Sequence, residues 1–178
     1  MKSINMLRKA FTKFLKTVLT LPIKQITIIA TWLDKWAGLI VREKGFKPEF
    51  MPRYKRGDIL YVDFGWNIGH EFGGVHYAAV LENDNPRSSG TILVIPLSSL
   101  DMGEQSNRNE VYLGNNVIPW ADSLETVAKP KQIRAISKMR ILKPTQNTHK
   151  QARLTCLQLD MIDDKVKQLI LKPTPFVE

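Results

Sequence analysis

Two histidines that flank a pair of glycines are the side chains in this sequence best suited to proton transfer. His70 and Glu71 lie inside the segment 65–74, and His76 follows the pair Gly73-Gly74 that ends it. An imidazole can accept or donate a proton near neutral pH, and glycines allow backbone to approach a ligand closely. The spacing therefore predicts a loop site at which one side chain acts as a base and another as an acid.

Strands predicted on either side of this loop would hold it in place. Strand-forming runs bounded by turn residues predict strands at 58–64, 75–82 and 91–96, and the connection 83–90 is rich in turn-forming residues. Further short strands are predicted at 110–113, 126–135 and 139–142. A helix is predicted from about residue 150 to 171. Several short strands closed by one helix predict a mainly β (α+β) fold built on a small barrel.

The predicted C-terminal helix carries its own start and stop signals. Asn147 or Thr148 could cap its first turn, and Pro173 would end it. The residues expected on its apolar side are Leu154, Leu157, Met161, Val166, Leu169 and Ile170. Cys156 falls within this pattern and is predicted to be a buried structural thiol.

The cysteine and histidine content limits the chemistry that can be expected. A single cysteine excludes an internal disulfide, and three scattered histidines argue against a multi-histidine metal site. One unpaired thiol suits a reducing cytoplasm. We therefore expect a cytoplasmic protein without a metal centre.

The N-terminal third is predicted to form two amphipathic helices that precede the strand-rich region. Apolar residues recur at helical spacing through residues 1–21, with basic residues between them. Pro22 interrupts at a position that suits the first turn of a second helix, which continues to about residue 44. A proline-containing linker follows. These boundaries predict a basic helical extension at 1–50 and a second domain at 53–172.

The positive charge of the chain is concentrated in this extension. The formal net charge is +9, and residues 1–57 contain 13 Lys or Arg against 3 Asp or Glu, a net of +10. Lys13 and Lys16 break the apolar run, which argues against a signal peptide, and no uncharged apolar run approaches the ~18 residues of a membrane span. Packing on the domain, on itself or on a partner, contact with nucleic acid, and contact with an anionic membrane surface all stay open.

Four segments occur in order between residues 53 and 171. They are Arg56-Gly57-Asp58 at a strand start, Gly69-His70-Glu71-Phe72-Gly73-Gly74, Ile95-Pro96-Leu97-Ser98-Ser99, and Gln132-Ile133-Arg134-Ala135-Ile136-Ser137-Lys138. In this order they resemble the opening strand, the G-x-E-x-x-G loop, the P-[LV]-T-[ST] strand end and the D-Q-I-R-T-[IV]-D-K segment of the MazF/PemK-like toxins of bacterial toxin–antitoxin systems. The first 50 residues lie outside the resemblance.

The resemblance implies an SH3-like β-barrel with a C-terminal helix, usually assembled as a homodimer. It also implies an mRNA interferase, an endoribonuclease that cuts single-stranded RNA without metal or cofactor, and an antitoxin that blocks its RNA groove. In such a reaction the 2′-hydroxyl attacks the phosphate, leaving a 2′,3′-cyclic phosphate and a 5′-hydroxyl. The step needs a base, an acid, and donors on the phosphoryl oxygens.

The sequence departs from the family pattern at positions that matter for this chemistry. His76 stands where the family usually has an arginine, Ser98 replaces the usual threonine, and Lys131 replaces the aspartate before the glutamine. We predict that His70 takes the 2′ proton and that His76 protonates the leaving oxygen or stabilises the phosphoryl group, although the two roles could be reversed. Ser98 and Lys131 would steady the phosphate.

Other residues in and around the resembling segments are predicted to contact RNA. They are Arg56, Trp66, Glu71, Gly73, Gly74, Lys131 and Arg134. Trp66 could stack on a base. Structural roles compete with these assignments, such as a loop hydrogen bond for His70, packing across the barrel mouth for Trp66, and an ion pair for Arg134. Two other functional classes stay open: an RNA- or antitoxin-binding module that lost catalysis with its arginine, and a membrane-surface or scaffold protein.

Overall fold

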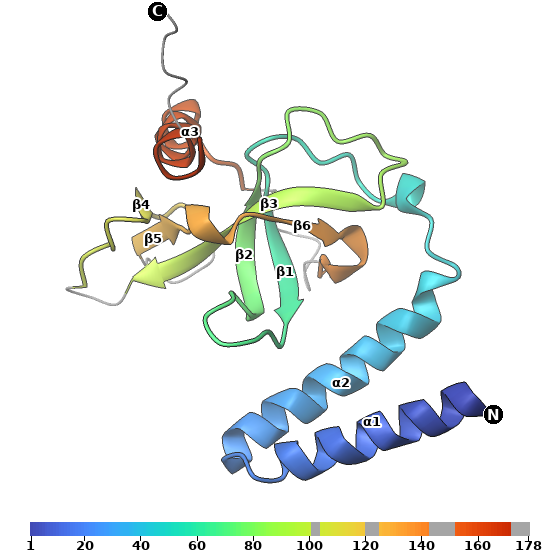
Figure 1. Cartoon of the computed structure of the whole chain (residues 1–178). Coiled ribbons are helices and arrows are strands. Elements are labelled where there is room, and N and C mark those ends of the chain that lie inside the picture. Colours follow the sequence, from blue (N-terminus) through green and yellow to red (C-terminus); the bar gives the residue numbers. More distant parts are fainter. Residues whose placement is uncertain (101–103, 120–124, 143–151, 172–178) are drawn as a thin grey trace, which may run out of the picture. The chain divides into compact units, whose positions relative to one another are not determined.

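The computed structural model describes residues 1–100, 104–119, 125–142 and 152–171. The chain divides into two compact units, Met1–Gly45 and Phe46–Glu178. The first unit contains two helices, and the second contains the strands and the C-terminal helix (Figure 1).

The first unit is a helical hairpin, as the apolar spacing predicts. Helix α1 spans Lys2–Val18 and helix α2 spans Ile23–Glu43, with a short turn between them. Pro22 is the residue immediately before α2, where its missing N–H costs the helix nothing. No helix among the described residues is both long enough and apolar enough to cross a bilayer.

The second unit is built on six antiparallel strands. Their bounds are β1 Ile59–Gly65, β2 Gly74–Val80, β3 Thr91–Leu100, β4 Val111–Asn115, β5 Glu125–Ala128 and β6 Arg134–Ser137. The order is β1-β2-β3-β5-β4, and β6 pairs with β3. Strand β3 is long enough to pair twice, with β2 and β6 through its first half and with β5 through residues 97–100. Both the mainly β (α+β) class and the C-terminal helix are confirmed.

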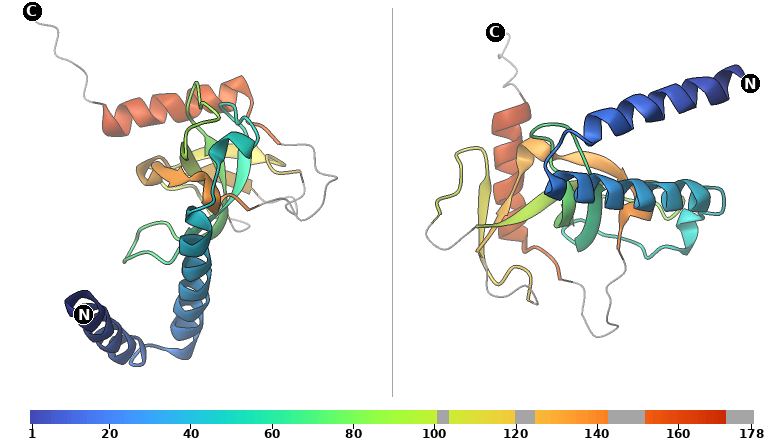
Figure 2. Two further views of the ribbon diagram at one scale, coloured as in Figure 1. Left: turned by 90° about the vertical axis from the view of Figure 1, so that its right-hand side faces the viewer. Right: turned by 90° about the horizontal axis from the view of Figure 1, so that it is seen from below.

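The sheet does not close into the predicted barrel within the described residues. Strand β1 lies at one end of the order and β4 at the other, and these two strands do not pair. The views in Figures 1 and 2 show β3 running between the two halves of the sheet. The sheet is therefore bent but open.

Side chains alternate between two apolar clusters on opposite faces of the sheet. One cluster contains Ile59, Ala79 and Ile95 and is covered by Ile162 of helix α3, which spans Cys156–Ile170. The other contains residues from the alternate positions, including Val62 and Phe64. Burying both faces explains why strands β1 and β2 are apolar along most of their length.

The last strands predicted from the sequence differ from those observed. Strand β5 ends at Ala128 because a 3-10 helix, η2, begins at Pro130 and continues to Gln132. A second 3-10 helix, η3, spans Lys138–Arg140, so the strand predicted at 139–142 is wrong and only an isolated bridge joins Val62 to Ile141. Proline lacks the N–H that a continuous ladder needs.

Helix α3 begins later than predicted. Thr155 caps it, since its hydroxyl accepts from the Gln158 N–H at 3.3 Å while its own N–H donates to Gln158 Oε1 at 2.9 Å. The caps predicted at Asn147 or Thr148 lie outside the described residues. Cys156, predicted to be buried, is exposed because it lies in the first turn after the cap.

The buried side of α3 agrees only in part with the predicted one: Leu154, just before the helix, is buried and Val166 packs against the first cluster, as predicted. Leu157, Met161 and Ile170, also predicted there, are exposed. Ile162, which was not predicted there, is fully buried, and Leu159 packs against the first cluster. Both pairs, Leu157 with Met161 and Leu159 with Ile162, have helical spacing, and contact with the sheet selects the second pair.

Candidate functional site

The loop between β1 and β2 has a tight base that only glycine can form. A Cβ atom at Gly73 would lie 2.8 Å from the carbonyl oxygen of Gly65, and Gly74 has a φ of +80°. Gly65 and Gly74 face each other across the two strands. Asp63 Oδ1 accepts a hydrogen bond from the Gly65 N–H at 3.0 Å. The glycine-rich segment therefore returns the chain sharply and places His76 beside the loop.

Gln132 holds this loop from a segment sixty residues away. Its Oε1 accepts from the Phe72 N–H at 3.1 Å and from Arg134 Nη2 at 3.0 Å, and its Nε2 donates to the His70 carbonyl at 3.1 Å. Inside the loop, Asn67 Nδ2 donates to the Phe72 carbonyl at 2.7 Å. The two amides fix the loop from both sides.

His76 lies half-buried on β2, next to the loop. Its ring packs against Phe72 with the ring centroids 4.5 Å apart. Burial and, secondarily, the positive charge of Lys129 lower the pKa of His76 below its ordinary value. The imidazole is therefore mainly neutral near pH 7, as a proton acceptor must be.

The charge of Lys129 is partly compensated by a neighbouring carboxylate. Lys129 Nζ lies 2.5 Å from Glu110 Oε1. Burial raises the pKa of Glu110, but the hydrogen bond from Lys129, that from the Asn107 backbone and the Lys129 charge outweigh it, so the pKa is lowered. The carboxylate of Glu110 is therefore ionised near neutral pH, and it holds the Lys129 side chain in place.

Strand register brings Ser98 and Arg134 onto the same face of the sheet as His76. Ala78 of β2 pairs with Pro96 of β3. His76 lies two residues before Ala78, and Ser98 lies two residues after Pro96. Arg134 pairs with Val94, two residues before Pro96. Since alternate strand residues share a face, the imidazole, the hydroxyl and the guanidinium lie on one side. The Ser98 hydroxyl donates weakly to the Ser99 carbonyl at 3.3 Å.

A second guanidinium, Arg140, lies at the end of β1. Its Nη1 donates to the carbonyls of Asp63 at 3.2 Å and Phe64 at 3.0 Å. Burial lowers the pKa of Arg140, the Asp63 charge raises it, and the charge of Arg134 lowers it, so the two guanidiniums are close enough to interact. Arg134 Cζ lies 5.6 Å from the centroid of the Phe64 ring. Arginine keeps its charge under these shifts.

The site can thus supply a neutral imidazole, a hydroxyl and two permanent cations. In the part of the chain that the structure describes, no group of three or more His, Cys, Asp or Glu side chains is placed to hold a metal ion. Sequence reasoning did not select Gln132 or Arg140. Gln132 lies in one of the four segments that resemble the toxin family, which could have indicated its role. Arg140 lies outside those segments, and no sequence pattern distinguishes it.

Comparison with known proteins decides the family. Residues 55–170 match the profile of the PemK-like, MazF-like toxins of type II toxin–antitoxin systems. The chain belongs to this family. The resemblance inferred from the four segments is confirmed, and residues 1–54 lie outside the match.

Two solved structures illustrate the similarity. The crystal structure of MazF (form I) from Deinococcus radiodurans is 20% identical, with a TM-score of 0.49, and the match covers 67% of this chain and 97% of that chain. The crystal structure of MazE–MazF (form II) from the same organism is 17% identical, with a TM-score of 0.43, covering 67% and 96%. No curated protein matches this sequence.

The other predicted site residues of this PemK/MazF-family chain take different positions. Arg56 donates to the Leu81 carbonyl, and its Nη2 lies 2.5 Å from Asp163 Oδ1 of α3, so it ties the helix to the sheet. His70 is exposed on the loop with its carbonyl bound to Gln132. Within the described residues neither the His70 nor the His76 side chain makes a hydrogen bond, and no ring contact joins them.

The remaining predicted contacts are accessible to a ligand. Trp66 and Glu71 are exposed on the loop, and Lys131 is exposed on η2. Lys131 and Gln132 are adjacent in η2, so Lys131 lies close to the segment that holds the loop.

Proposed function

We propose that this chain is a toxin-type endoribonuclease that cleaves single-stranded RNA by attack of the 2′-hydroxyl. The observation that carries the proposal is the set of groups on one face of the sheet beside the fixed loop: a neutral imidazole, a hydroxyl and guanidiniums. Membership in a family of type II toxins supports the same class of activity.

His76 is the proposed general base. Its lowered pKa keeps it unprotonated, so it takes the proton of the 2′-hydroxyl as that oxygen attacks phosphorus. The O2′–P bond forms and the P–O5′ bond breaks, which gives a 2′,3′-cyclic phosphate and a 5′-hydroxyl. His70, exposed on the loop, is the proposed acid that protonates the leaving O5′. This is the reverse of the first assignment from the sequence.

Arg134 and Arg140 would take over the electrostatic role of the arginine that His76 replaces. Both cations lie by Phe64 at the end of β1, and a charged guanidinium can donate to two phosphoryl oxygens at once. Ser98 and Lys131 would add hydrogen bonds to the phosphate. Trp66 would stack on a neighbouring base, and Glu71, Gly73 and Gly74 would contact the RNA through the loop.

A protein antitoxin is the proposed partner, since toxins of type II systems are paired with one. Such a partner would inhibit by covering the loop and the two guanidiniums. Assembly as a homodimer and a cytoplasmic location remain predictions.

The test is cleavage of single-stranded RNA by the purified chain in EDTA. Fragments ending in a 2′,3′-cyclic phosphate are expected, with a loss of about 10²-fold or more in His76→Ala. Arg134→Ala should lose activity by about 10²-fold, as expected for removing a charge on the transition state. Arg53→Ala is the matched control, because Arg53 pairs with Asp84 at an exposed site.

A binding module without catalysis is the second candidate, because the family arginine is His76 here. It predicts that RNA is bound but remains intact, and that Arg134→Ala weakens binding. Full cleavage by His76→Ala would refute the proposed base while leaving the enzyme class in place.

A further inference from the structure

The N-terminal hairpin has a face of one charge. The first 33 residues contain six basic side chains and no acidic one. Four of these, Arg8, Lys9, Lys13 and Lys16, line a shallow hollow of about 510 Å³ on α1 together with two threonines. The polar groups that line this hollow are cations and hydroxyls, and no carboxylate is among them.

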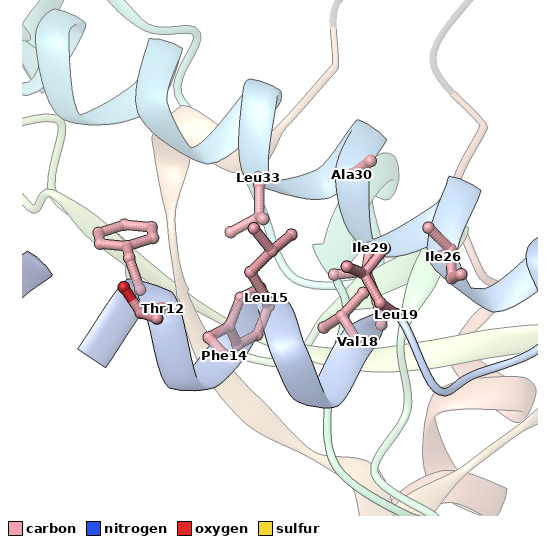
Figure 3. Close-up of a pocket in the computed structure, with 10 residues that line it drawn as sticks. Thr12, Phe14, Leu15, Val18, Leu19, Ile26, Ile29, Ala30 and Leu33 are labelled. Atoms are coloured by element: carbon pink, nitrogen blue, oxygen red, sulfur yellow. The ribbon is translucent and has the colours of Figure 1, made fainter. Parts of the chain in front are cut away.

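The hairpin also has an open apolar groove. A hollow of about 340 Å³ between α1 and α2 is lined, apart from Thr12, by apolar side chains. Figure 3 shows Leu15 of α1 and Leu33 of α2 pointing toward one another across it. Within this unit only Val18 and Ile29 are buried. Phe11 and Leu15 remain 52% and 57% exposed.

Contiguous exposed apolar side chains, such as those lining this groove, are unusual on a surface that contacts only water. Exposed contiguous apolar side chains mark a surface that binds something. Trp32 and Trp36 lie one turn apart on α2, and Trp36 is 48% exposed. Tryptophan is enriched where an apolar phase meets water, because its ring is apolar and its N–H is polar.

We propose that the hairpin binds the surface of a membrane containing anionic phospholipid. The apolar groove would take up acyl chains, and the lysines would extend to the headgroup phosphates. A basic polar face opposite Phe and Leu is the pattern of helices that lie in the interface. The helices would lie on the membrane, since none among the described residues is suited to cross it.

Other occupants satisfy only part of this surface. RNA would neutralise the cations but leave Phe11 and Leu15 in water. A second copy of the chain would cover the groove but bring two sets of six cations together. An anionic bilayer matches both the charge and the apolar side chains.

Sedimentation of the full chain with vesicles tests the charge. We expect binding to phosphatidylcholine vesicles containing phosphatidylglycerol, little binding to phosphatidylcholine alone, and weakening by salt. Each lysine near an anionic surface contributes about fivefold to the partition coefficient, so Lys13→Gln/Lys16→Gln should lower it about 25-fold. Lys165→Gln/Lys167→Gln, which removes two lysines from α3, is the matched control and should bind normally.

A second pair of variants tests the apolar groove. Phe11→Ser/Leu15→Ser should weaken binding by at least about tenfold, because two apolar side chains no longer enter the bilayer. Leu157→Ser, at an exposed leucine of α3, is its control. Circular dichroism of each variant in buffer shows whether the helices are retained. Because RNA cleavage is not measured, the outcome is independent of the proposed ribonuclease activity.

Several results would overturn the proposal. Equal binding to both vesicle types would show that the basic side chains do not make the contact. Binding unchanged in both N-terminal double variants would show that neither the basic face nor the groove makes it. Absence of vesicle binding would do the same. A molecular mass that increases with protein concentration would then indicate that a second copy of the chain covers the groove. Binding of single-stranded RNA that is lost in Lys13→Gln/Lys16→Gln would indicate that the basic face binds nucleic acid.

Discussion

Replacing Gln132 with alanine should release the glycine-rich loop while the sheet stays folded. The Gln132 amide makes hydrogen bonds to the Phe72 N–H, the His70 carbonyl and Arg134. Each such bond contributes about 1 kcal/mol net, but Gln132 is half-buried and water replaces part of the loss, so we expect about 1–2 kcal/mol in total. The loss should fall mainly on local opening of the loop.

Hydrogen exchange at the Phe72 amide is the direct assay, because that N–H donates to the Gln132 side chain. Exchange at this position should become about tenfold faster in Gln132→Ala, while amides of β1 and β3 keep their protection. The free energy of global unfolding, measured in urea, should decrease by less than the free energy of loop opening. The rate of RNA cleavage should also decrease, because the loop is less ordered.

Two further variants separate the loop from general stability. Gln132→Glu keeps an acceptor for Phe72 but cannot donate to the His70 carbonyl, so Phe72 should stay protected. Gln158→Ala removes the same side chain from α3, where it completes the cap and donates to the Leu113 carbonyl at 2.8 Å. It should destabilise the domain without affecting Phe72 selectively. Wild-type exchange at Phe72 in Gln132→Ala would refute the reasoning.

The remaining predictions concern His76, Lys129 and Gly73. Burial and the charge of Lys129 lower the pKa of His76 in the folded chain. As the pH falls below about 6.5, the unfolded chain therefore protonates this histidine before the folded chain does, and the free energy of unfolding should decrease. The decrease should be smaller in His76→Gln, which lacks the imidazole. Urea unfolding at about pH 5 and about pH 7.5 measures this, and equal slopes in both proteins would contradict it. Lys129→Gln should raise the pKa of His76, followed by NMR titration of the imidazole; an unchanged titration would mean that burial alone sets the pKa. Gly73→Ala should destabilise the domain by about 1–3 kcal/mol in urea unfolding, since its Cβ would contact the Gly65 carbonyl oxygen at 2.8 Å, whereas Gly90→Ala, with open space around it, should cost far less.

Local patterns predicted most of the elements. The spacing of apolar residues defined both N-terminal helices, and Pro22 marked the start of α2. Strands β1 and β2 begin and end within two residues of the prediction, because turn residues bound them on each side. Strand β3 begins at Thr91 as predicted but continues to Leu100, beyond the predicted end at 96, because residues 97–100 pair with β5. The matched segments also identified the family. Each of these depends on residues close in sequence.

Predictions failed where contacts distant in sequence decide the outcome. Leu157 and Met161 have helical spacing, as do Leu159 and Ile162, and only the position of the sheet determines which pair packs against it. The segment at 139–142 is apolar enough for a strand, but it forms a 3-10 turn that places Arg140 against β1. Periodicity carries no information on either choice.

By itself the sequence determined the family, the helical hairpin with its charge, and a glycine-rich loop beside two histidines. The tertiary structure alone decided which side chains meet. It placed Gln132 on the loop, Arg140 at the end of β1 and Lys129 near His76, and it engaged Arg56 in a structural ion pair. The physical reason is that charge, spacing and turn chemistry are local properties, whereas pKa values and hydrogen-bond partners depend on burial and on strand pairing between distant segments.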